Sequence, residues 1–250
     1  KLTNSFKIFW FNNWFWSKPY KPKKFWININ SPLFLSGVNF KCLRNKPILD
    51  VIIESFAKQG FYRFCIGTHF KGEIIKNYFG DGSKRNLEID YLDEDEPLGT
   101  GGALGLLSKD HLRELPMVII NGDILTNLDM HSLLNYHNEV KATATMCVKQ
   151  YSYQIPYGVV EADGDNFKVL IEKPSTYYSV NSGIYVASPE VLDNVPTNIK
   201  ITMPEIFDIL VSKKVEVKIF PIHEYWLDIG RPDEFERAQT EIDWAYWENE

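Results

Sequence analysis

The chain has 250 residues, of which 44% are hydrophobic and 24% charged, an ordinary composition for a folded domain with one large core. Its formal net charge of −6 argues against nucleic acid as a partner. The sequence also has no run near the ~18 apolar residues of a membrane span, so we expect no membrane insertion. Three scattered cysteines without metal spacing argue against a disulfide framework and favour a cytoplasmic protein.

Charge and composition change near residue 45. Residues 1–50 hold nine Lys or Arg and one acid, which leaves 27 − 9 = 18 basic and 33 − 1 = 32 acidic residues for the rest. Residues 1–44 are rich in Trp, Asn and Lys and follow no helical or strand period. We therefore divide the chain into an atypical basic segment, 1–44, and a folded domain, 45–250. The basic, aromatic segment either binds a membrane surface or nucleic acid, or is a stretch not shaped for function.

Helical and strand patterns alternate along the first part of the folded domain. The patterns predict a helix over 47–58, a strand over 62–67, a helix over 71–79, a strand over 87–91, a helix beginning within 101–107 and a strand over 117–120. This alternation indicates a Rossmann-like α/β fold, with a mostly parallel sheet flanked by helices on both faces.

Short strands follow one another in the second part of the domain. We expect strands over 143–148, 158–161, 168–171 and 183–187, then a helix over 204–213, a strand over 215–220 and a closing helix over 232–247. The short connections predict an antiparallel second lobe beside the parallel sheet.

Two aspartates, Asp123 and Asp228, each end an apolar run where a turn begins. In an α/β sheet, ligands gather beyond the carboxyl ends of the strands. Two carboxylates brought there by different strands can hold a Mg²⁺ ion, which prefers oxygen ligands and is often shared with substrate phosphates. The alternative is that each Asp caps a following helix.

A glycine-rich stretch, Pro97–Leu104, lies at a predicted strand-to-helix junction. Without Cβ atoms, Gly99 and Gly102 allow the main chain, with that of Leu98, to approach a flat base or a phosphate. The alternative is an ordinary glycine turn.

A second polar set lies between residues 157 and 185. Glu172 has the carboxylate that suits paired sugar hydroxyls, and Lys173 suits a phosphate as a point charge. Gly158 and Asn181 belong to neighbouring motifs, and we expect all four residues to line the cleft of the two aspartates. Alternatively, each is a turn residue or a solvated charge.

In order, these motifs resemble those of the sugar-1-phosphate nucleotidyltransferases, a family that includes glucose-1-phosphate thymidylyltransferases and mannose-1-phosphate guanylyltransferases. The matching stretches are Asn45-Lys-Pro-Ile-Leu, Leu98-Gly-Thr-Gly-Gly, Asn121-Gly-Asp, Tyr157-Gly, Glu172-Lys-Pro, Asn181-Ser-Gly-Ile-Tyr and Trp226-Leu-Asp-Ile-Gly-Arg-Pro.

The resemblance implies a nucleotide-diphospho-sugar transferase-like fold with a sugar-binding lobe. It also implies Mg²⁺ at Asp123 and Asp228, and base contacts around Leu98, Gly99 and Gly102. Sugar contacts would come from Gly158, Glu172 and Asn181, with Lys173 on the sugar phosphate. In that family a sugar-1-phosphate attacks the α-phosphorus of a nucleoside triphosphate, and pyrophosphate leaves.

The N-terminus departs from the family, which opens with a strand and a G-x-G-T-R loop that holds the triphosphate. Residues 1–44 contain one glycine, Gly37, and the nearest candidate for the first strand is Lys7–Phe11. We therefore expect residues 1–44 to be irregular and pyrophosphate release by this chain to be weak or absent. Two functions stay open: nucleotidyl transfer, and a non-catalytic homologue that binds sugar phosphate or nucleotide. The oligomeric state also stays open, a homo-oligomer included.

Overall fold

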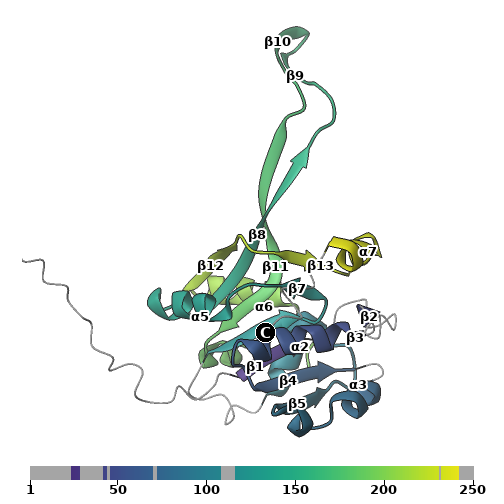
Figure 1. The fold of residues 1–250 in the computed structure, drawn as a ribbon. Helices are drawn as coiled ribbons and strands as arrows, with labels where there is room; N and C mark the ends of the chain where they lie inside the picture. The colour runs from purple at the N-terminus through teal and green to yellow at the C-terminus, as the bar shows by residue number, and fades with distance from the viewer. Residues whose placement is uncertain are drawn as a thin grey trace, which may run out of the picture.

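A computed structural model describes residues 24–28, 42–43, 46–69, 72–107, 116–230 and 232–241. Its centre is a seven-stranded sheet in the order β12-β8-β11-β6-β1-β4-β5 (Figure 1). These strands are β1 (Lys24–Asn28), β4 (Arg63–Thr68), β5 (Glu88–Asp93), β6 (Met117–Asn121), β8 (Ala144–Gln154), β11 (Ser175–Ala187) and β12 (Val217–Ile222). Three two-stranded pairings join β2 (Cys42–Leu43) to β3 (Lys46–Pro47), β7 (Ile124–Thr126) to β13 (Trp226–Asp228), and β9 (Val159–Asp163) to β10 (Asn166–Ile171).

The helices are α2 (Ile48–Lys58), α3 (Gly72–Phe79), α4 (Gly99–Gly102), α5 (Met130–Glu139), α6 (Met203–Ser212) and α7 (Pro232–Glu241). Short 3₁₀ turns are η2 (Ser83–Arg85), η3 (Ala103–Leu106) and η5 (Pro189–Asn194). None of the described helices combines the length and the apolar character that crossing a membrane requires.

The sheet is mostly parallel, as the sequence predicts. β6, β1, β4 and β5 run parallel to one another, and β12 runs parallel to β8, while β11 is antiparallel to both of its neighbours. The carboxyl ends of β5, β4, β1, β6 and β8 therefore lie at one edge of the sheet, which we call the carboxyl edge. Ligands of α/β sheets bind at such an edge.

The first strand differs from the expectation for residues 1–44. Lys24–Asn28 forms β1 in the middle of the sheet, with Phe25 in register with Phe64 of β4 and Val118 of β6. The boundary at residue 44 thus does not separate the basic segment from the sheet, since this strand precedes it. The candidate strand Lys7–Phe11 lies outside the described residues.

Alternate residues of β6 serve two hydrophobic cores, one on each face of the sheet. Val118 and Ile120 pack with α2, α3, α5 and α7, whereas Met117 and Ile119 pack with η3, η5 and α6. This is why the strand is a continuous apolar run: both of its faces are covered. Helix α6 begins at a capping box in which Thr202 and Glu205 satisfy each other's main-chain N–H groups.

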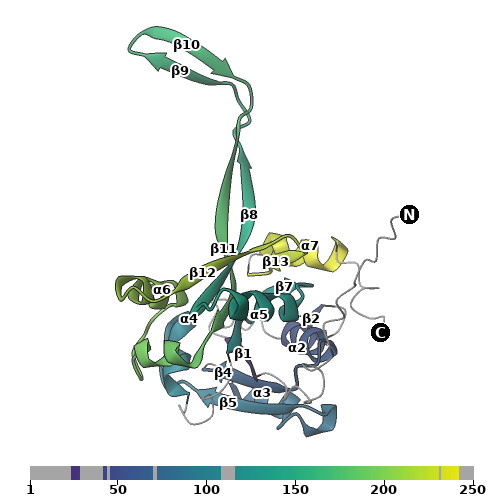
Figure 2. The ribbon, with the colours of Figure 1, turned by 90° about the vertical axis from the view of Figure 1, so that its left-hand side faces the viewer.

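The expected second lobe is instead an extension of the same sheet. β8, β11 and β12 belong to the seven-stranded sheet, and β8 and β11 continue beyond it as a two-stranded ribbon with hairpin β9–β10 at its far end (Figures 1 and 2). We call residues 150–179 the arm. Within the described chain, the outer part of this ribbon pairs only with itself, because β12 pairs with β8 as far as Lys149.

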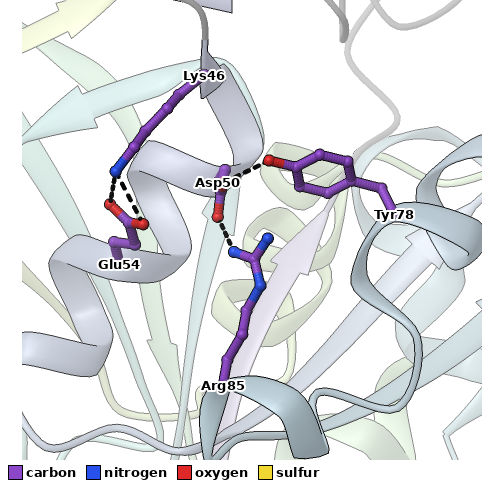
Figure 3. A network of polar contacts seen from close by, with 5 residues as sticks. All are labelled: Lys46, Asp50, Glu54, Tyr78 and Arg85. Carbon is purple, nitrogen blue, oxygen red and sulfur yellow. Dashed lines mark hydrogen bonds and ion pairs between the residues drawn. The ribbon is translucent and has the colours of Figure 1, made fainter.

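A buried carboxylate ties α2 to the segment after α3 (Figure 3). Asp50 is 3% exposed, forms an ion pair with Arg85 and accepts a hydrogen bond of 2.7 Å from the Tyr78 hydroxyl. The Arg85 guanidinium also lies 5.2 Å from the ring centroid of Tyr78. Nearby, Lys46 and Glu54 form an exposed ion pair at 2.9 Å.

Asp50→Ala should lower the free energy of unfolding by about 2–4 kcal/mol, because it leaves the half-buried guanidinium of Arg85 without its counter-charge. Lys46→Ala is the matched control, and its exposed ion pair should contribute less than about 1 kcal/mol. Urea titration of the two variants measures both values. Equal losses of unfolding free energy in the two variants would show that burial does not increase the contribution of the Asp50–Arg85 ion pair to stability.

A buried histidine joins α5 to the sheet. His137 is 1% exposed, with Nδ1 2.8 Å from Thr145 Oγ1 and Nε2 3.0 Å from Ser188 Oγ. Burial lowers its pKa to about 4 from an ordinary 6.5, against a small opposing effect of the Glu190 carboxylate. His137 is therefore neutral in the folded chain down to low pH.

Between pH 6.5 and 4 the unfolded chain binds a proton at His137 that the folded chain does not, so stability should fall as the pH falls through this window. We expect His137 to contribute a loss of about 2–3 kcal/mol between pH 7 and pH 4.5. His137→Gln, which cannot titrate, should show a pH dependence flatter by that amount in urea unfolding at the two pH values. An unchanged slope would mean that His137 is already charged in the folded protein.

Candidate functional site

The structure brings the main chains of Asp123 and Asp228 side by side at the carboxyl edge. Asp123 follows β6 in the turn before β7, and β7 pairs antiparallel with β13 so that Asp228 is in register with Ile124. The N–H of Ile229 donates to the carbonyl of Asp123 at 3.0 Å. Two strand ends that are separated by a hundred residues in the sequence are thus joined by main-chain hydrogen bonds.

The two carboxylates have different surroundings. Asp123 is 8% exposed, whereas Asp228 is exposed and its Oδ1 accepts a hydrogen bond of 2.9 Å from the N–H of Gly230. That bond shapes the turn after β13. Neither aspartate caps a helix here, since α5 begins at Met130 with Asp129 as its N-cap, and α7 begins at Pro232.

The donor set at this edge suits a hard cation that is shared with a ligand. The two carboxylates supply oxygen atoms, and the Oδ1 atom of Asn121, two residues before Asp123, is buried and has no hydrogen-bond partner among the described residues. Among the described residues no group of three or more His, Cys, Asp or Glu side chains gathers as a metal cage. Mg²⁺ favours sites in which the protein supplies few ligands and phosphate oxygens complete the coordination shell.

β11 has an irregular turn between Asn181 and Tyr185, where its register with β8 shifts, and this turn fixes the side chain of Asn181. Asn181 Oδ1 accepts from the N–H of Gly183 at 3.0 Å, and its Nδ2 donates to the Tyr185 hydroxyl at 2.7 Å. The Trp226 indole N–H, two residues before Asp228, donates to the carbonyl of Ser182 at 2.8 Å. The turn is therefore fixed from the β13 side.

Gly183 is required in this turn for two reasons. Its φ is +72°, and a Cβ atom there would lie 2.8 Å from Asn121 Nδ2. A side chain at position 183 would push Asn121 out of the place it occupies beside Asp123.

The glycines after β5 serve the packing of the chain itself. Gly99 has φ +79°, and a Cβ there would meet the carbonyl oxygen of Ile201 at 2.8 Å; one at Gly102 would meet Leu98 Cβ at 2.5 Å. Leu98 is 6% exposed, and its carbonyl accepts from the N–H of Ile201 at 2.8 Å. These contacts explain the glycines without a ligand, so the predicted base contacts of Leu98, Gly99 and Gly102 stay a prediction.

Glu94 is a buried acid at this site that was not among the residues predicted from the sequence. It is 5% exposed, its Oε2 accepts from the N–H of Leu98 at 2.8 Å, and its carbonyl lies 2.7 Å from His69 Nδ1. It sets the main chain at the start of the glycine-rich stretch. The signal was hidden because Glu94 stands in the run Asp93-Glu-Asp-Glu96, in which nothing marks one acid as buried.

The remaining predicted residues lie on the arm. Gly158 and Glu172 are neighbours, since a Cβ on Gly158 would lie 3.0 Å from Glu172 Oε2. Lys173 has φ +45°, and its carbonyl accepts from Gln154 Nε2 at 3.2 Å. We call these three residues, Gly158, Glu172 and Lys173, the arm corner, because the ribbon turns there into hairpin β9–β10 (Figure 2).

The structure does not bring the arm corner to the aspartates of the same chain. Asn181 lies six positions along β11 from its first residue, Ser175, which is roughly 20 Å at 3.3 Å per residue, and Lys173 lies two residues before Ser175. The predicted sugar set is thus divided: Asn181 lies at the root of the arm, and the arm corner lies where the β8–β11 ribbon meets hairpin β9–β10.

Comparisons with known proteins identify the family. A model of the family described as "Nucleotidyl transferase" matches residues 38–243. A D-glycero-alpha-D-manno-heptose 1-phosphate guanylyltransferase of Aneurinibacillus thermoaerophilus is 32% identical over 203 residues, 79% of this chain and 86% of that protein. A mannose-1-phosphate guanylyltransferase of Mycobacterium tuberculosis is 30% identical over 203 residues, 78% of this chain and 56% of that protein, so the chain spans about half of this relative.

A solved structure supports the fold. HddC from Yersinia pseudotuberculosis superposes with a TM-score of 0.66 at 22% identity, over 88% of this chain and 99% of that chain. With 206 of 250 residues inside the family match (38–243), the chain belongs to the nucleotidyl transferase family, among the sugar-1-phosphate nucleotidyltransferases, and has their mixed α/β fold.

Proposed function

We propose that this chain serves the transfer of a nucleotidyl group from a nucleoside triphosphate to a sugar-1-phosphate, with release of pyrophosphate. The observation that carries the proposal is the β7–β13 pairing, which sets Asp123 beside Asp228 at the carboxyl edge. The names of the relatives favour guanine as the base and a mannose- or heptose-type 1-phosphate as the acceptor.

Mg²⁺ is the cation that the donor set supports best. Asp123 and Asp228 would hold it, and when bound it would neutralise charge on the phosphates. Gly183 leaves room for the side chain of Asn121, two residues before Asp123. Asp228 stays solvent-exposed at the mouth of the site, where a triphosphate can reach it.

The chain's own groups would position the two substrates. The stretch from Leu98 to Gly102, set by Glu94, would receive the base, and Asn181 would bind a sugar hydroxyl. Gly158 and Glu172 would contact the sugar, and Lys173 its phosphate. Catalysis would come from positioning and charge stabilisation, because phosphoryl transfer of this kind needs no covalent intermediate on the protein.

The cysteines agree with a cytoplasmic setting, which is part of the proposal. Cys147 is a free thiol, and burial raises its pKa far above the ordinary value, which makes this thiol unreactive.

The missing glycine loop favours a second function, binding without turnover. The residues after β1, where the family has its triphosphate loop, are 29–41, and they contain Gly37 but no Gly-x-Gly sequence. The two functions separate in one pair of measurements: pyrophosphate release, and calorimetric binding of GTP with Mg²⁺ and of a hexose-1-phosphate. Binding without pyrophosphate release would identify the non-catalytic homologue.

Asp228→Asn should abolish Mg²⁺-dependent binding of GTP and lower any pyrophosphate release at least ~100-fold, because one of the two charged ligands of the cation is lost. Asp90→Asn is the matched control, since Asp90 is also exposed and lies on the edge strand β5. Calorimetry with and without Mg²⁺ measures the binding. Mg²⁺-dependent affinity that survives in Asp228→Asn would remove this residue from the metal site.

Lys173→Ala should weaken binding of a hexose-1-phosphate by about 10–100-fold, the value of one charge-assisted hydrogen bond. Lys168→Ala on β10 is the control, because Lys168 is an exposed arm lysine that pairs with Asp163 at 3.4 Å. Titration calorimetry compares the two variants. Equal affinity in both would exclude Lys173 as the phosphate ligand.

A further inference from the structure

The arm exposes most of the large apolar side chains on the described surface. Of fifteen exposed large hydrophobic residues, ten lie on it: Tyr151, Tyr153, Tyr157, Val160, Phe167, Val169, Leu170, Ile171, Tyr177 and Tyr178. An isolated two-stranded ribbon is marginal in water, and a contiguous apolar surface of this kind marks an interface.

The inner ribbon of the arm has one tyrosine face. In the β8–β11 register Tyr151 is opposite Tyr178, Tyr153 opposite Thr176 and Lys149 opposite Val180. Residues opposite each other, and residues two apart, share one face of a sheet. Tyr151, Tyr153, Tyr178 and Val180 therefore form an apolar stripe, which we call the tyrosine face. The other face carries Gln, Ser and Tyr177.

The root of the arm is fixed to the body, which prevents the arm from folding back. Lys149 Nζ donates to the carbonyls of His223 and Glu224, at 3.3 and 2.8 Å, and Ser182 Oγ donates to the carbonyl of Cys147 at 2.9 Å. To reach the aspartates of its own chain, the arm corner would have to break the pairs between β8 and β11 from residue 150 outward.

We propose that two copies of this chain exchange arms about a two-fold axis, with tyrosine face against tyrosine face. The midpoint between Lys173 and Asn181 is position 177, next to the Tyr151–Tyr178 pair. An axis there lays the two arms antiparallel, so the arm corner of one copy falls at the root of the other, beside Asn181 and the aspartates. The partner thereby supplies the half of the sugar site that one chain holds roughly 20 Å along β11 from Asn181.

Area and charge agree with a second copy as the occupant. Tyr151, Tyr153 and Tyr178 are each more than half exposed and offer roughly 100 Å² apiece, about 600 Å² from two copies. The apolar residues of hairpin β9–β10 add a similar amount, which reaches the ~1,200 Å² of a stable interface. The only charged residue on the tyrosine face is Lys149 at its root, so two such faces do not repel. A two-fold interface is self-complementary, as this one would be.

The first test is the mass of the chain in solution by light scattering at about 50 μM, a concentration at which an interface of this size is occupied. The expected mass is twice 29.1 kDa. Tyr151→Lys/Tyr178→Lys should give a monomer with an unchanged melting profile, since both side chains are exposed. Two controls should stay dimeric: Tyr177→Lys on the opposite face of the arm, and Val211→Lys, an equally exposed apolar residue of α6 on the body. A monomeric parent chain, or a dimer that survives in the double variant, overturns the proposal. If the parent chain is a monomer, another protein or the chain's own body would cover the tyrosine face.

The second test asks whether the partner completes the site, a point that rests on the proposed function. The monomeric double variant should bind a hexose-1-phosphate at least ~10-fold more weakly than the parent, although neither tyrosine belongs to the predicted sugar set. Unchanged binding in a true monomer overturns the shared site. A dimer whose parent form binds no hexose-1-phosphate refutes the proposed function instead, and leaves the arm exchange established by mass.

Discussion

The antiparallel pairing of β7 with β13 is the constraint on which the site depends. It joins the segment after β6 to a strand from late in the sequence, and a hydrogen bond of 3.0 Å from the N–H of Ile229 to the carbonyl of Asp123 continues the pairing beside the two aspartates. Trp226 extends the same constraint to β11 through Ser182. Any change that separates β7 from β13 would divide the carboxylates and release the turn that holds Asn181.

Many residues around the site either leave room for a neighbouring group or fix the position of the main chain. Gly183 leaves room for Asn121, and the glycines after β5 let the segment around Ile201 approach closely. Glu94, by its bond to Leu98, fixes where that stretch begins. The site therefore consists mainly of positioned main chain with few charged side chains. This composition is expected where a metal ion and substrate phosphates supply most of the charge.

The arm gives the sheet a second role beyond carrying the site. β8 and β11 have buried apolar residues where they lie in the sheet and exposed tyrosines where they leave it. One part of each strand thus belongs to the core, whereas the other part forms a surface that no other described part of the same chain covers. That division accounts for the distance between the two halves of the predicted sugar set, and association of two copies would remove it.

The sequence alone determined the family and the elements with a clear apolar period, but it did not predict α5, β7 or β13. The apolar periods of 47–58, 62–67 and 117–120 matched α2, β4 and β6, because burial on one or two faces leaves a local pattern. Motif order sufficed for the family. Only the tertiary structure decided the rest: the central place of β1, the burial of Glu94 and the position of Lys173 far from Asp123. These features depend on pairings between segments that are distant in the sequence. A local sequence pattern does not determine which strand will pair with a given strand, or where a ribbon leaves the sheet.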